Sequence, residues 1–95
     1  MARLRPNDPD EEAQRLEKQR RFMDRARKGV LKHIVEAGGE LHMKDMHDYS
    51  ERRFFIAHRA FSDMMEFFVE QQLIDFDPSS MMATITQSGR DFIDE

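Results

Sequence analysis

Residues 73–86 read LIDFDPSSMMATIT, and this stretch decides the fold. Its first part, Leu73 to Asp77, alternates apolar and polar residues in the manner of a strand. Pro78-Ser79-Ser80 has the composition of a turn, and Met81 to Thr86 can return as a second strand. The stretch therefore predicts a β-hairpin.

Helices are expected on both sides of this hairpin. After it, Thr86 or Ser88 can cap a short closing helix that runs from Gly89 to Ile93 and on to the end. Before it, residues 50–72 contain no Gly or Pro, and their apolar residues repeat at spacings of three and four, which predicts an amphipathic helix. The apolar stripe of this helix consists of Phe54, Ala57, Phe61, Met64 or Met65, and Phe68.

A long first helix is expected at residues 11–37, where apolar residues recur at helical spacing. Asp10 can cap this helix, and Gly38 with Gly39 supplies its stop. Residues 1–10 contain two prolines and show no apolar periodicity, so they are predicted to form a flexible tail.

Two short elements fit between the glycines and residue 50. Glu40-Leu41-His42 can form a strand, and Met43 to Tyr49 is long enough for two helical turns. The predicted fold class is therefore mainly α with a small β-hairpin, an α+β arrangement. Its elements follow the order helix, strand, helix, helix, strand, strand, helix in one domain that covers residues 11–95.

Composition narrows the classes of protein further. The chain has 95 residues, which fit a single domain, and 39% of them are hydrophobic. It has no cysteine, which excludes disulfides, thiolate metal sites and cysteine nucleophiles. The sequence has no signal-peptide pattern and no long apolar run, so we expect a cytoplasmic protein without a membrane partner.

Charge is distributed unevenly along the chain. The net charge is −4, yet residues 15–33 contain eight Lys or Arg against two acidic residues, and residues 62–95 contain eight Asp or Glu against one Arg. Basic charge can therefore be concentrated on one part of the surface. Within the basic run, Arg15, Lys18, Arg25 and Lys32 are expected to be spread around the first helix and to serve mainly as its solvated surface.

Enzymatic and metal-binding patterns are missing from the sequence. There is no Gly-rich phosphate loop, no nucleophile beside an evident base and no isolated carboxylate pair. His42, His47 and His58 lack the spacing of a helical metal site, and neither Asp45 nor Asp48 completes one. The chain is therefore predicted not to be an enzyme and to need neither a cofactor nor a metal ion.

The order of elements resembles the winged helix-turn-helix domains of bacterial and archaeal transcription regulators of the MarR, ArsR and PadR groups. Residues 38–46 (GGELHMKDM), residues 70–74 (EQQLI) and residues 86–92 (TQSGRDF) are similar to the junctions of those domains. The similarity covers about residues 28–95. One departure is that Gln72 stands where those domains place a glycine between the recognition helix and the wing.

The resemblance implies a DNA-binding transcription regulator whose third helix reads the major groove of duplex DNA. The helix can begin near Ser50, which gives Arg52 and Arg53 the leading role, or near Ala57, which gives that role to His58, Arg59 and Ser62. The sequence leaves both possibilities open. The candidate DNA-contacting residues are Lys44, Ser50, Arg52, Arg53, His58, Arg59 and Ser62.

Two further expectations concern partners. Duplex readers commonly present two half-site helices, so we expect a homodimer, although Arg20 and Arg27 make a regular coiled coil through the first helix unfavourable. The predicted wing carries Asp75 and Asp77 and no basic residue, which favours the alternative of a protein-interaction module on the same fold.

Overall fold

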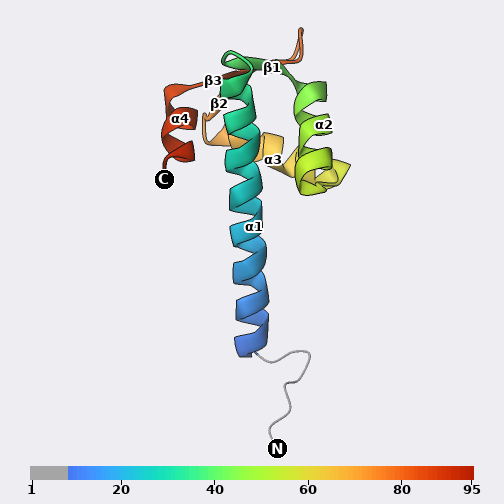
Figure 1. The fold of residues 1–95 in the computed structure, drawn as a ribbon, viewed down its shortest axis with the longest axis vertical. Coiled ribbons are helices and arrows are strands. Elements are labelled where there is room, and N and C mark those ends of the chain that lie inside the picture. Colours follow the sequence, from blue (N-terminus) through green and yellow to red (C-terminus); the bar gives the residue numbers. More distant parts are fainter. Residues whose placement is uncertain (1–8) are drawn as a thin grey trace, which may run out of the picture.

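The computed structural model describes residues 9–95 and confirms the predicted order of elements. The chain is mainly helical with a small three-stranded antiparallel sheet (Figure 1). The elements are α1 (Pro9–Glu36), β1 (Glu40–His42), α2 (Met43–Phe54), α3 (His58–Glu70), β2 (Ile74–Asp77), β3 (Met82–Ile85) and α4 (Gln87–Ile93).

The start of α1 differs from the prediction. The helix begins at Pro9, so Asp10 lies in its first turn instead of capping it. Proline is well tolerated there because the first amides of a helix have no partner within the helix. Residues 9 and 10 therefore belong to α1, and the rest of the predicted tail, residues 1–8, lies outside the described residues.

The predicted hairpin forms, and β1 adds a third strand to it. The strand order is β1-β3-β2, with Glu40 opposite Thr84 in one pair and Ile74 opposite Ile85 in the other. Ala83 and Ile85 on β3 are buried, while Thr84 between them is exposed. This alternation places one face of β3 on the core.

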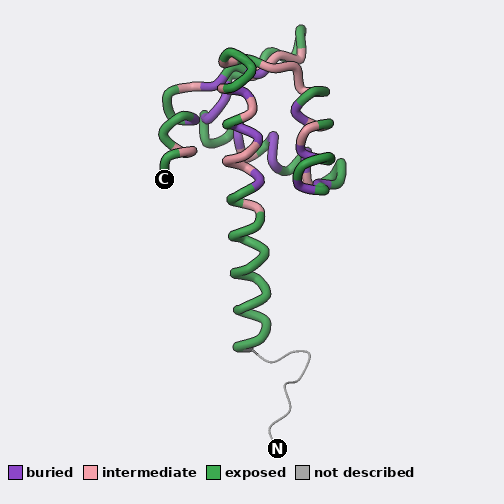
Figure 2. Tube along the Cα trace, viewed as in Figure 1, coloured by how far each residue is buried: buried purple, intermediate pink, exposed green. Residues whose placement is uncertain are grey.

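Helix α1 runs through the middle of the domain and beyond it. It packs between α2 and α4 with its last eleven residues, from Ala26 to Glu36, whereas α3 lies behind it (Figure 1). Residues 10–25 are all exposed except Met23, which is half-buried (Figure 2). We call residues 9–25 the arm; at 1.5 Å per residue it is about 25 Å long.

The core draws on every element. Its fully buried side chains come from the inner face of α1 and from α2, α3 and β3, and Met and Phe fill much of the space. Adaptable methionines suit a small core that several elements enclose. The core residues with no exposed surface are Ala26, Val30, Leu31, Ile34, Met46, Met64, Phe68 and Ala83.

The break between the second and third helices lies at residues 55–57, which decides between the two predicted starts. Helix α2 continues through Phe54, and α3 begins at His58 after the N-cap Ala57. The expectation of one helix over residues 50–72 is therefore wrong. Phe54 belongs to the end of α2, where its ring lies against Gly29 of α1.

The end of α3 explains the departure at Gln72. This residue has a positive φ of 56°, its amide donates to the Val69 carbonyl, and the Leu73 amide donates to the Phe68 carbonyl. That pair of bonds defines a Schellman motif, whose left-handed position favours glycine. Gln72 thus adopts a backbone conformation that glycine favours.

Thr86 ties this helix end to the closing helix. Its hydroxyl donates to the Gln72 carbonyl at 2.7 Å and accepts from the Gly89 amide at 3.0 Å, which makes Thr86 the N-cap of α4. Within residues 9–95, every helix is too short or too polar to cross a membrane.

Candidate nucleic-acid interface

The turn between α2 and α3 is short and strained. Phe55 adopts a left-handed conformation with φ 57°, and its side chain is 88% exposed. A left-handed conformation costs a residue with a Cβ about 1 kcal/mol, and an exposed aromatic ring forgoes its hydrophobic stabilisation. Two local costs at one residue mark this turn as a place where function can take precedence over stability.

The structure places six of the seven predicted DNA-contacting residues on the surface. Arg52 and Arg53 end α2, His58 and Arg59 begin α3, and Ser62 follows one turn later. Lys44 is exposed in the first turn of α2. Only residues 55–57 separate the two helices, so the arginines of α2 and Arg59 are close in the sequence, whereas Phe54 and Ile56 between them are buried.

Ser50 is the exception, because it is fully buried. Its hydroxyl donates to the His47 carbonyl at 2.8 Å, within the same helix. This bond satisfies the hydroxyl in the core, so it is not available to a ligand outside. The placement of Ser50 among the DNA-contacting residues is therefore not compatible with its burial.

The arginines of α2 make only weak contacts with the protein. The Nε of Arg52 donates to the Asp48 carbonyl at 3.3 Å, and the guanidinium of Arg53 lies 5.2 Å from the centre of the Phe54 ring. Both residues are exposed, and each keeps further guanidinium N–H groups that these contacts do not use. Guanidinium groups of this kind suit phosphate oxygens, which accept two hydrogen bonds from one arginine.

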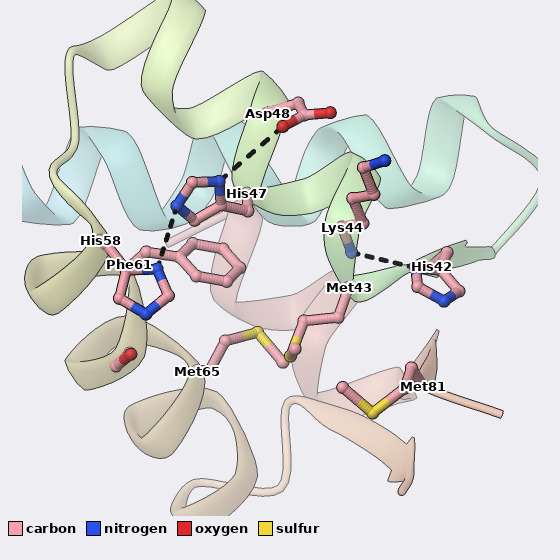
Figure 3. Close-up of a pocket in the computed structure, with 10 residues that line it drawn as sticks. His42, Met43, Lys44, His47, Asp48, His58, Phe61, Met65 and Met81 are labelled. Carbon is pink, nitrogen blue, oxygen red and sulfur yellow. Dashed lines mark hydrogen bonds and ion pairs between the residues drawn. The ribbon is translucent and has the colours of Figure 1, made fainter. Parts of the chain in front are cut away.

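A groove of about 580 Å³ lies between the first turns of α2 and α3 and the hairpin loop. The thioether side chains of Met43, Met65 and Met81 line it together with the ring of Phe61 (Figure 3). Three of the predicted DNA-contacting residues also line this groove, namely Lys44, His58 and Ser62. Its wall is therefore largely apolar, and its edge carries polar and basic groups.

Histidines connect the two helices at one edge of this groove. The Nδ1 of His58 and the Nε2 of His47 lie 3.4 Å apart, and the Nδ1 of His47 lies 3.8 Å from a carboxylate oxygen of Asp48 (Figure 3). The His47 ring also packs edge-on to Phe61, with 5.0 Å between centroids. His42 has a different role, because its Nδ1 accepts from the Lys44 amide and caps α2. Among residues 9–95, no group of three or more His, Asp or Glu side chains is arranged to hold a metal ion.

The hairpin formed by β2 and β3 presents acidic groups. The Asp77 carboxylate accepts hydrogen bonds from the Ser79 amide at 2.9 Å and the Ser80 hydroxyl at 3.0 Å, and these bonds lower the pKa of Asp77 below its usual 3.8. Asp75 is exposed on β2, and no Lys or Arg occurs between Arg59 and Arg90. The hairpin therefore cannot contribute cationic contacts to a phosphate backbone.

Sequence reasoning missed two features of this region. The left-handed Phe55 carries no sequence signal, because Phe is rarely found in that conformation. Three methionines from separate parts of the chain line the groove. The spacing of residues along the sequence does not reveal that the fold brings them together. Comparisons with protein-family models, curated proteins and solved structures give no match to this chain.

Proposed function

We propose that this chain is a winged helix-turn-helix protein that binds duplex DNA as a transcription regulator, with α3 entering the major groove. The observation that carries the proposal is a set of exposed basic side chains on both sides of the α2–α3 turn. It consists of Arg52 and Arg53 from the end of α2 and Arg59 from the first turn of α3, beside the exposed ring of Phe55.

The order of elements supports the same assignment. A helix, a three-residue turn and a second helix are followed by an antiparallel hairpin, as the winged helix-turn-helix arrangement requires. The first turn of α3 exposes amides and long polar side chains, which suit contacts with base edges and phosphates. The acidic hairpin implies that the affinity comes from the helices, and a homodimer would double this contribution.

A second candidate function is binding of a partner protein at the groove. The observation that favours it is the apolar wall formed by Met43, Met65, Met81 and Phe61. Methionines adapt their shape to apolar side chains of a partner, and acidic side chains on the wing would not repel such a ligand. Binding of this kind would lack the steep salt dependence of phosphate contacts.

The test is fluorescence anisotropy with a pool of random-sequence duplexes about two helical turns long, titrated over a series of salt concentrations. Each phosphate contact contributes about 0.9 to the slope of log K against log salt. For each protomer bound to the duplex, Arg59→Ala should therefore weaken binding about eightfold at about 0.1 M salt and lower that slope by about 0.9.

Arg20→Ala is the matched control for this experiment. Arg20 is exposed on the arm, so this variant changes the net charge by the same amount at a distant site. Wild-type protein that shows no duplex binding at low salt would refute the proposal, as would equal losses in Arg59→Ala and Arg20→Ala.

A further inference from the structure

Basic residues form a row along the outer face of α1. Since α1 is one unbroken helix from Pro9 to Glu36, each residue advances about 100° around its axis. Successive members of the row are separated by three, four, three and four residues, so they share a sector about 80° wide. The members of this basic row are Lys18, Arg21, Arg25, Lys28 and Lys32.

This arrangement corrects one expectation from the sequence. Arg15, Lys18, Arg25 and Lys32 are expected from the sequence to be spread around the helix. The spacing of seven places the last three within about 40° of one another, whereas Arg15 lies about 60° from Lys18. The buried residues Ala26, Val30 and Ile34 occupy the opposite side of α1. The row therefore faces away from the core.

The row is only partly neutralised by its own chain. Within α1, Glu17 and Asp24 lie just outside the sector, and Glu36, four residues after Lys32, lies inside it at the end of the row. Glu17 pairs with Arg21 at 2.9 Å, and Asp24 lies 3.8 Å from Arg27, which is not in the row. Lys28 donates to the main-chain oxygen of Glu95 at 2.8 Å, and Lys32 lines a small pocket together with Asp94.

Like charges at these spacings destabilise a helix by a few tenths of a kcal/mol per pair, because they are close neighbours on its surface. An ordinary solvated helix avoids this cost by mixing acidic and basic residues. A row of one sign, about 21 Å long, is suited instead to a linear polyanion. Duplex nucleic acid carries one charge per about 1.7 Å of its axis, which offers on the order of ten phosphates over that length.

An anionic membrane surface fits less well. A helix that lies on a membrane buries an apolar face among the lipids, but from Ala26 onward the apolar face of α1 is already used by the core. Phe22, at 41% exposure, lies beside the row, and the half-buried Val35 lines a pocket with Lys32. The chemistry of the row thus favours phosphates held in a line.

We infer that the basic row of α1 is a second contact surface for duplex nucleic acid, on the side of the domain away from α3. Figure 1 shows α1 in front and α3 behind it. One domain can therefore contact two duplexes, or two segments of one bent duplex. This inference rests on the proposed function in one respect, since both surfaces take the same class of ligand.

Arg25→Ala and the double variant Lys18→Ala/Arg25→Ala test the row in the anisotropy assay with random-sequence duplexes. Arg25→Ala should weaken binding about eightfold at about 0.1 M salt, and the double variant should lower the salt slope by about 1.8. Arg20→Ala is again the matched control, because Arg20 lies about 140° around the helix from Arg25. Far-UV circular dichroism of each variant establishes that α1 remains helical.

The experiment tests the proposed α3 surface and the proposed α1 surface independently. Losses in Arg25→Ala but not in Arg20→Ala support the row, whatever the effect of Arg59→Ala. Equal affinities of Arg25→Ala and Arg20→Ala would overturn the row, and a loss confined to Arg59→Ala would overturn it while leaving the proposed function intact. Wild-type protein that binds no duplex would overturn both.

Discussion

Substitution of Gly89 by alanine tests how α4 is seated on the hairpin. A Cβ at this position would lie 2.2 Å from the Leu73 carbonyl oxygen and 2.9 Å from Cγ1 of Ile85. An ordinary carbon–oxygen contact is about 3.3 Å or longer, so α4 and the Leu73 carbonyl must separate by about 1 Å. The Leu73 oxygen also accepts a hydrogen bond from the Thr86 amide at 3.1 Å, and the shift disrupts this bond.

Three contributions set the expected loss of stability. Overpacking costs about 1–3 kcal/mol, loss of the Thr86 bond costs about 1 kcal/mol, and the higher helix propensity of alanine returns about 1 kcal/mol. The net destabilisation is therefore about 2 kcal/mol. A domain of this size has a free energy of unfolding of about 5–14 kcal/mol. The Tm of the Gly89→Ala variant should therefore be about 8–16 °C lower than that of the wild-type protein.

Urea and thermal unfolding followed by circular dichroism measure this change. Ser88→Ala is the matched control, because Ser88 is the preceding residue of α4 and is exposed. It should change the free energy of unfolding by less than about 0.5 kcal/mol. A Gly89→Ala protein as stable as Ser88→Ala would refute the close approach of α4 to the hairpin.

Two other substitutions or conditions have defined outcomes. Gln72→Gly should raise the free energy of unfolding by about 0.5 kcal/mol, because relief of the left-handed strain exceeds the entropy that glycine adds to the unfolded chain; an unchanged or lower urea midpoint would contradict this. Asp77 should titrate below 3.8 in an NMR pH titration, because the Ser79 amide and the Ser80 hydroxyl stabilise its charged form. The stability that these bonds contribute is present above the unfolded pKa and is lost as the pH falls through the folded pKa. Asp77→Asn should remove this acid-dependent part, and a folded pKa at or above 3.8 would contradict the assignment.

The sequence predicted the sheet and the closing helix well because their signals are local. Alternation over residues 73–77, a Pro-Ser-Ser turn and the Thr86 cap each depend on neighbouring residues, and the structure confirms the elements that they predicted. The break at residues 55–57 has no such signal. Neither Gly nor Pro occurs there, and Ala57 caps α3 without a side-chain hydrogen bond.

The sequence predicted the candidate site only to the extent that it predicted where each residue lies around its helix and whether that residue is exposed. The exposed positions of Arg52, Arg53 and Arg59 follow from their charge, whereas Ser50 could be buried because its hydroxyl bonds within its own helix. The basic row could have been found from the spacing of Lys18, Arg25 and Lys32 alone. The groove could not, because its methionines come from separate elements that only the tertiary fold brings together.

The continuity of α1 has a consequence for how its arm responds to a ligand. Residues 26–36 are ordered by the core, so helix over residues 9–25 is extended from an existing end and avoids the unfavourable nucleation step. Arm amides should therefore exchange with solvent through local opening that leaves the core folded, progressively faster toward Pro9. A ligand held along the basic row would slow that exchange in the arm first, and hydrogen exchange would record its binding residue by residue.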